Sequence, residues 1–108
     1  LQAELASIDE SVAGLEAQVT GLKGIIDSRR NQQALLREEL AGVRDLVGEG
    51  YAPRSRQLEL ERALSEVTGN LADAQGNLVR AQRQIAELHQ RATQRRQEFR
   101  KEVDGLLA

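Results

Sequence analysis

The chain has 108 residues, of which 40% are hydrophobic and 30% charged but only 2% aromatic, and its net charge is −2. Leu, Ala, Val and Ile supply most of the apolar content, which is typical of long helices or a coiled coil and not of a compact globule. The nearly neutral charge gives no general attraction for nucleic acid or anionic lipid, and the lack of cysteine excludes disulfides and thiolate metal sites. No apolar run approaches the roughly 18 residues that a membrane span needs.

Apolar residues recur at alternating spacings of four and three along the first half of the chain. They occupy the a and d positions of a heptad repeat, which we call the seam, and predict a helix over residues 1–48. Arg29 and Gln33 fall in the same register. We interpret them as residues that specify the register, with a contact between copies as the alternative. The apolar seam residues of this helix are Leu1, Leu5, Ile8, Val12, Leu15, Val19, Leu22, Ile26, Leu36, Leu40, Val43 and Val47.

The seam is interrupted where two glycines, the only proline and the only tyrosine fall within six residues. Either Gly48 or Gly50 can take the left-handed conformation that closes a helix. Pro53 has no backbone N–H, which costs nothing in the first turn of a new helix. We therefore predict a tip turn over residues 49–53 that includes Tyr51. A turn this short makes the two flanking helices antiparallel neighbours.

The heptad pattern resumes in a second predicted helix over residues 54–107. Its seam has less bulk, and Arg95 is a further polar seam residue. The predicted fold class is all-α, with two long helices forming one antiparallel coiled-coil hairpin over residues 1–108. Because the chain starts without Met and ends in helical register, we expect it to be a fragment of a larger protein. The seam residues of this helix are Leu60, Leu64, Val67, Leu71, Ala74, Leu78, Ala81, Ile85, Leu88, Ala92, Arg95, Phe99, Glu102 and Leu106.

The charge distribution also favours a fold-back. Residues 1–27 are mostly acidic among their charged positions, whereas residues 80–101 are mostly basic. With the turn near Gly50, facing residues have numbers that add to about 100, so the acidic start lies beside the basic end. Each exposed pair contributes only ~0.2–1 kcal/mol, which selects orientation more than it stabilises the fold.

Nothing in the sequence indicates catalysis. His89 is the only histidine and lies among charged residues, where we interpret it as a solvated surface group. No nucleophile–base pair, phosphate-binding glycine loop or cluster of metal ligands is present. We therefore expect a protein that is not an enzyme and that holds no cofactor or metal.

Three residues at the start of the second helix lie outside the seam. Leu58 and Ser65 share one heptad position on the solvent side, and Arg54 stands one turn before Leu58. A single exposed leucine is normal on a protein surface, and this simple interpretation stays open. The alternative is a helix-docking stripe, in which the leucine fills a groove and the arginine and serine form hydrogen bonds.

Arg54, Leu58 and Ser65 resemble the RLS motif of periplasmic adaptor (membrane fusion) proteins. The surrounding "LVGEGYAPRSRQLELER" is similar to adaptors of type I secretion, the HlyD family. This resemblance implies a periplasmic hairpin whose parent protein is anchored in the inner membrane beside an ABC transporter. It also implies that the three residues dock onto a TolC-like outer-membrane channel, and that several copies form a ring.

Two other functions remain as alternatives. The basic residues between Arg80 and Lys101 could form a nucleic-acid-binding arm like those of some tRNA synthetases. They lie far from the turn, face acidic residues and lack aromatic stacking partners, so we expect no nucleic-acid partner. A purely structural coiled-coil spacer is the other alternative.

Overall fold

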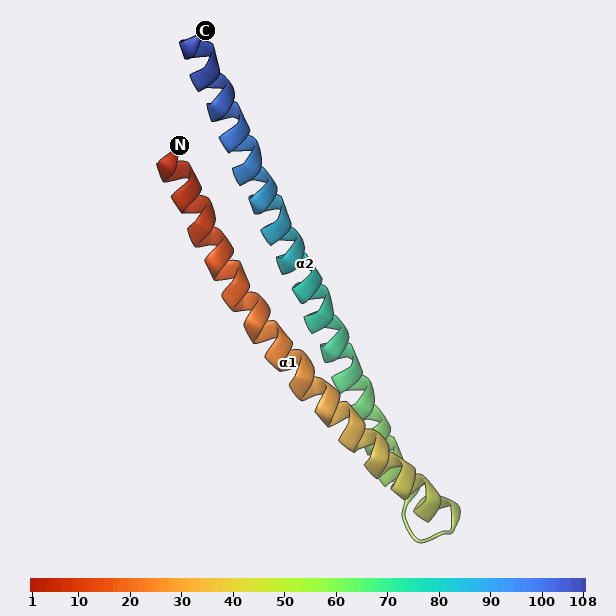
Figure 1. Ribbon diagram of the computed structural model, residues 1–108. Coiled ribbons are helices and arrows are strands. Elements are labelled where there is room, and N and C mark those ends of the chain that lie inside the picture. The colour runs from red at the N-terminus through yellow and green to blue at the C-terminus, as the bar shows by residue number, and fades with distance from the viewer. The chain divides into compact units, whose positions relative to one another are not determined.

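The computed structural model describes all 108 residues and contains two helices, α1 (Gln2–Gly48) and α2 (Arg54–Leu107). A single short loop joins them, and no strand is present (Figure 1). The chain forms two compact units. We call Leu22–Asn77 the loop unit, and Leu1–Gly21 together with Leu78–Ala108 the terminal unit. In each unit a segment of α1 packs antiparallel against a segment of α2, which confirms the predicted all-α coiled-coil hairpin.

The core of the loop unit consists of seam residues from both helices. Leu40 and Leu60 are the most buried, at 2% and 4% exposed. The polar seam residue Gln33 donates a hydrogen bond from Nε2 to Thr68 Oγ1 across the two helices, at 3.1 Å. This cross-helix bond supports the interpretation of Gln33 as a residue that fixes the register. The other buried core residues of this unit are Ile26, Val67, Leu71 and Ala74.

The terminal unit has a smaller core, in which Ile8 and Val12 of α1 pack with Ala92 of α2. Beside this core, Arg95 Nε donates to both carboxylate oxygens of Glu4, at 3.2 and 3.0 Å. An acidic residue near the chain start thus pairs with a basic residue of α2, in the expected register of about 100. Leu5, Ile85 and Leu88 pack against the same core and are half-buried.

The predicted seam is wrong at the end of α2. Phe99 is 42% exposed and Leu106 is 87% exposed, and Glu102 is exposed as well. Leu1 at the chain start is the α1 seam residue level with Phe99, so Phe99 has α1 on one side only and the later turns of α2 have no α1 seam residue opposite them. Periodicity alone predicts which positions share a face, and burial of that face needs a partner.

Candidate docking site at the loop

The loop begins with a specific helix cap. Gly50 has a φ of 81°, in the left-handed region, whereas Gly48 is the last residue of α1. The Tyr51 N–H donates to the Leu46 carbonyl at 2.8 Å, and the Gly50 N–H donates to the Val47 carbonyl at 3.1 Å. These two bonds form a Schellman motif, which satisfies carbonyls that the helix end would leave unpaired. Gly50 is therefore the glycine that closes α1.

The other side of the loop starts α2. Pro53 immediately precedes Arg54, the first residue of α2, and its carbonyl accepts a hydrogen bond from the Arg56 N–H at 3.1 Å. Proline has no N–H to leave unpaired at this position and its fixed φ suits a helix start. The cap on α1 and the proline before α2 together fix the direction of the loop. The Tyr51 side chain is 79% exposed there.

Arg54, Leu58 and Ser65 are all exposed on the loop unit, and the Leu58 side chain is 36% exposed. Leu58 and Ser65 share heptad position b, so they lie on one side of α2, with Arg54 one turn before Leu58. Within the chain, no hydrogen bond engages the Arg54 guanidinium or the Ser65 hydroxyl. The stripe therefore offers an apolar surface flanked by a free cation and a free hydroxyl.

A carboxylate that the sequence analysis did not single out lies beside this stripe. Glu61 Oε1 accepts hydrogen bonds from Gln57 Nε2 at 3.0 Å and from Arg44 Nη2 of α1 at 3.2 Å. The bond from Gln57 and then that from Arg44 lower the pKa of Glu61, with a smaller electrostatic contribution from Arg54. Glu61 is thus ionised at neutral pH and joins the two helices next to Leu58.

A second ion pair crosses the helices near the loop. Arg56 Nη2 lies 2.6 Å from Glu39 Oε1, and Arg56 Nη1 lies 3.2 Å from Glu59 Oε2. Exposed ion pairs stabilise only weakly, but these pairs involve different residues from the stripe and leave it unoccupied. Neither helix contains a segment with the length and hydrophobicity of a membrane span. No group of His, Asp and Glu side chains is arranged to hold a metal ion.

Two antiparallel helices closed by a capped loop place the chain among long helical hairpins. All of residues 1–108 match the family model described as AprE, long alpha-helical hairpin, and the chain belongs to this family. The soluble domain of LipC, a membrane fusion protein of a type I secretion system, has a similar solved structure. Its TM-score is 0.92 at 31% identity, over 98% of this chain and 40% of that chain.

Two curated relatives are similar in sequence. The alkaline protease secretion protein AprE of Pseudomonas aeruginosa is 46% identical over 81 residues, which are 75% of this chain and 19% of that protein. The proteases secretion protein PrtE of Dickeya chrysanthemi is 37% identical over 84 residues, which are 78% of this chain and 19% of that protein. The matched part thus spans about a fifth of these relatives, both of which are named as secretion proteins. These findings confirm the resemblance to type I secretion membrane fusion proteins.

Proposed function

We propose that this chain is the periplasmic hairpin of a type I secretion membrane fusion protein. The loop end docks onto a TolC-like outer-membrane channel and links it to an inner-membrane ABC transporter for protein export. The parent protein is anchored in the inner membrane, and several copies of it form a ring. The hairpin has a mechanical, non-catalytic role and needs no cofactor.

The observation that carries this proposal is the stripe of Arg54, Leu58 and Ser65 beside the loop. The stripe is exposed, its polar groups are free, and the Glu61 interactions hold the two helices together directly next to it. A partner built of helices presents grooves for a leucine, and carboxylates and carbonyls for an arginine and a hydroxyl. Membership of a family that includes secretion proteins supports a channel as that partner.

The test is the variant Leu58→Ala in the full-length protein, with binding to the purified TolC-like channel of the same host as the readout. We expect a loss of about 1–2 kcal/mol of binding free energy, which is roughly a tenfold weaker affinity. Thermal unfolding should change little, because Leu58 lies outside the seam. Arg54→Ala should weaken binding in the same way.

Leu46→Ala is the matched control. Leu46 is also an exposed leucine near the loop, at 44%, but it lies on α1 at heptad position g. The Leu46→Ala variant should bind the channel with the same affinity as the wild type. Equal effects of Leu58→Ala and Leu46→Ala, or no effect of either, would contradict the stripe as the docking site and favour a simple spacer.

The nucleic-acid alternative meets a structural objection. Arg95, near the centre of the basic region, interacts with the carboxylates of Glu4, Glu98 and Glu102 at 3.0, 3.6 and 3.8 Å. A guanidinium surrounded by carboxylates is a poor phosphate contact. Salt-sensitive binding to RNA that is lost on neutralising Arg95 and Arg96 would overturn our assignment.

A further inference from the structure

The loop unit carries two rows of opposite charge, each repeating every seven residues. All six side chains are exposed or only partly buried. The basic row lies on α1 at heptad position e, and the acidic row lies on α2 at position c. The basic row consists of Arg30, Arg37 and Arg44. The acidic row consists of Glu59, Glu66 and Asp73.

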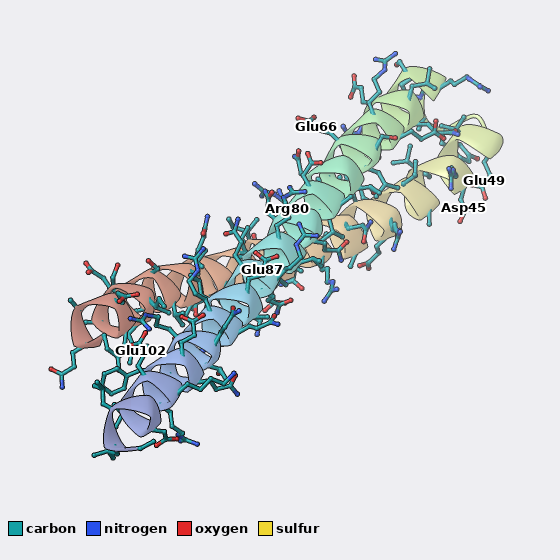
Figure 2. The ribbon with its side chains drawn as sticks, turned by 90° about the horizontal axis from the view of Figure 1, so that it is seen from above. Asp45, Glu49, Glu66, Arg80, Glu87 and Glu102 are labelled. Carbon is teal, nitrogen blue, oxygen red and sulfur yellow. The ribbon has the colours of Figure 1, made fainter.

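The two rows lie on opposite faces of the helix pair. In an antiparallel pair the e positions of both helices border one side of the seam, and the g positions, next to c, border the other. Arg44 pairs with Glu61 on the first face. Glu66 projects outward from α2 (Figure 2) and lines an open groove of about 550 Å³ on the second face, together with Leu35 and Val67.

The two rows are also matched in height. Facing residues of the two helices have numbers that add to about 100, so Arg37 is level with position 63. Glu66 is therefore about three residues, or ~4.5 Å, further along the axis than the point level with Arg37. The offset is the same for Arg44 and Glu59, and for Arg30 and Asp73. An arginine side chain reaches this far. If two copies stand side by side at equal height, every arginine of one face meets a carboxylate of the next copy.

The same relation does not hold in the terminal unit. The relation already ends at Lys23, the next e position, which comes towards Arg80, and in the terminal unit Glu16 of one copy comes towards Glu87 of the next; both are like-charge pairs. Like charges across an interface are unfavourable and exclude partners. The charge complementarity is therefore confined to the loop unit.

Most of these charges are available to a partner. Four of the six side chains form no ion pair inside the chain, namely Arg30, Arg37, Glu66 and Asp73. Arg44 already pairs with Glu61, and Glu59 with Arg56.

Apolar surface lies beside both rows of charge. Leu35, in the groove of the acidic face, is 65% exposed. On the basic face, position b holds Ala34 and Ala41, whose small side chains allow a second copy to approach closely.

We propose that the loop unit is a self-assembly surface, in which the basic face of one copy packs on the acidic face of the next. Such a contact uses two different faces, so it is heterologous and closes into a ring when the rotation permits. This inference rests on the proposed function for the existence of a ring and adds which faces meet and where. The basic row lies on α1 and the docking stripe on the adjoining side of α2, so the two contacts use different side chains.

Disulfide crosslinking tests the proposal, because the sequence has no cysteine of its own. One tagged copy carries Arg37→Cys and a second carries Glu66→Cys, and both are produced as full-length protein in a host strain without the channel. We expect the disulfide between the two different variants. Each variant alone should give no dimer, because identical positions lie far apart across a heterologous contact.

Charge reversal gives a second readout that leaves the internal ion pairs intact. Reversing the basic row with Arg30→Glu and Arg37→Glu should reduce crosslinking to a copy with an unchanged acidic row about tenfold or more. Reversing the acidic row with Glu66→Arg and Asp73→Arg should have the same effect on crosslinking to a copy with an unchanged basic row. For these variants the cysteines are placed at Ala34 of α1 and at Asn70 of α2, which lines the groove beside Glu66. Combining all four reversals should restore the crosslink. Glu38→Arg with Arg62→Glu, at outermost positions of the two helices, is the control and should have no effect.

The outcomes separate this inference from the proposed function. Crosslinks between identical positions, no crosslink between Arg37→Cys and Glu66→Cys, or failure of the fourfold reversal to restore it would overturn the two-face contact. Since the channel is absent, loss of channel docking by Leu58→Ala has no bearing on these results. A protein with an unchanged docking stripe that crosslinks as expected but does not bind the purified channel would count against the proposed function alone.

Discussion

The loop unit and the terminal unit follow the same heptad rule but differ in what they bury. In the loop unit, large residues such as Leu40, Leu60 and Ile26 are at most 5% exposed. In the terminal unit, two of the four buried residues are Ala81 and Ala92, and the leucines around them are only half-buried. Buried apolar area is the main source of stability, so the loop unit is the better-packed region.

The polar contacts differ in the same direction. Two residue pairs, Arg44 with Glu61 and Arg56 with Glu39, join the helices in the loop unit. In the terminal unit the cross-helix pair involves Arg95, through Glu4. A docking surface must hold its side chains in fixed positions, and a closely packed region does this at lower entropic cost. The proposed docking stripe thus lies on the unit that is built more rigidly.

The largest expected effect is on the loop unit's core. Leu40→Ala removes a side chain that is 2% exposed and should reduce the free energy of unfolding by about 2–5 kcal/mol. Urea unfolding followed by far-UV circular dichroism measures this. Leu35→Ala, at a leucine that is 65% exposed, should change stability by less than about 0.5 kcal/mol. Similar losses for both variants would show that the loop unit lacks the packed core described here.

Two glycines at the loop should change the stability in opposite directions when each is replaced by alanine. Gly50→Ala should destabilise by about 1–2 kcal/mol, because its φ of 81° is unfavourable for any residue with a Cβ. Gly48→Ala should stabilise by up to ~1 kcal/mol, because Gly48 is helical and no atom lies within 4 Å of the added Cβ. Thermal unfolding compares the two. A shift in the same direction for both would contradict the cap at Gly50.

In the terminal unit we expect a smaller and salt-dependent effect. Arg95→Ala removes the contacts to Glu4 and should lower the melting temperature at low ionic strength. The wild type and the variant should approach each other at high salt, because ions screen the pair. Arg83→Ala, at an outward-facing arginine, is the control. A salt-independent loss would mean that Arg95 acts through packing of its aliphatic stem.

The smallest expected effect is a pH dependence in the loop unit. The pKa of Glu61 is lowered below its ordinary value of 4.5 by the bonds from Gln57 and Arg44. Its ionisation therefore stabilises the fold above pH 4.5, and this contribution is lost as the pH falls below that value towards the lowered pKa. Glu61→Gln should flatten the dependence of melting temperature on acid pH, while Glu38→Gln should not. Identical profiles for Glu61→Gln and the wild type would contradict the lowered pKa.

Heptad spacing predicted the seam well, since every seam residue named for α1 is buried or half-buried. It failed at Phe99 and Leu106, because a repeat gives the direction of a side chain and not the presence of a partner. The choice between Gly48 and Gly50 also needed coordinates, because both residues can adopt the left-handed conformation.

The proposed docking stripe was predicted from sequence because Leu58 interrupts the polar side of α2, and the structure confirms only that its three side chains are exposed. Glu61 was missed, because carboxylates beside a coiled-coil seam are common and carry no individual signal. Its partner could have been found from register, since Arg44 and Glu61 both occupy e positions and their axial offset of about five residues, or ~7.5 Å, is within the combined reach of the two side chains. The division into two units has no sequence signal that we can identify.

The exposed ring of Tyr51 has a practical consequence. The chain contains no tryptophan and no other tyrosine, so its near-ultraviolet emission originates almost entirely from the loop. With 79% of the residue open to solvent, that emission responds to whatever covers the loop. The protein therefore carries its own optical probe at the position where a partner is proposed to arrive, and contact there is measurable without attaching a dye.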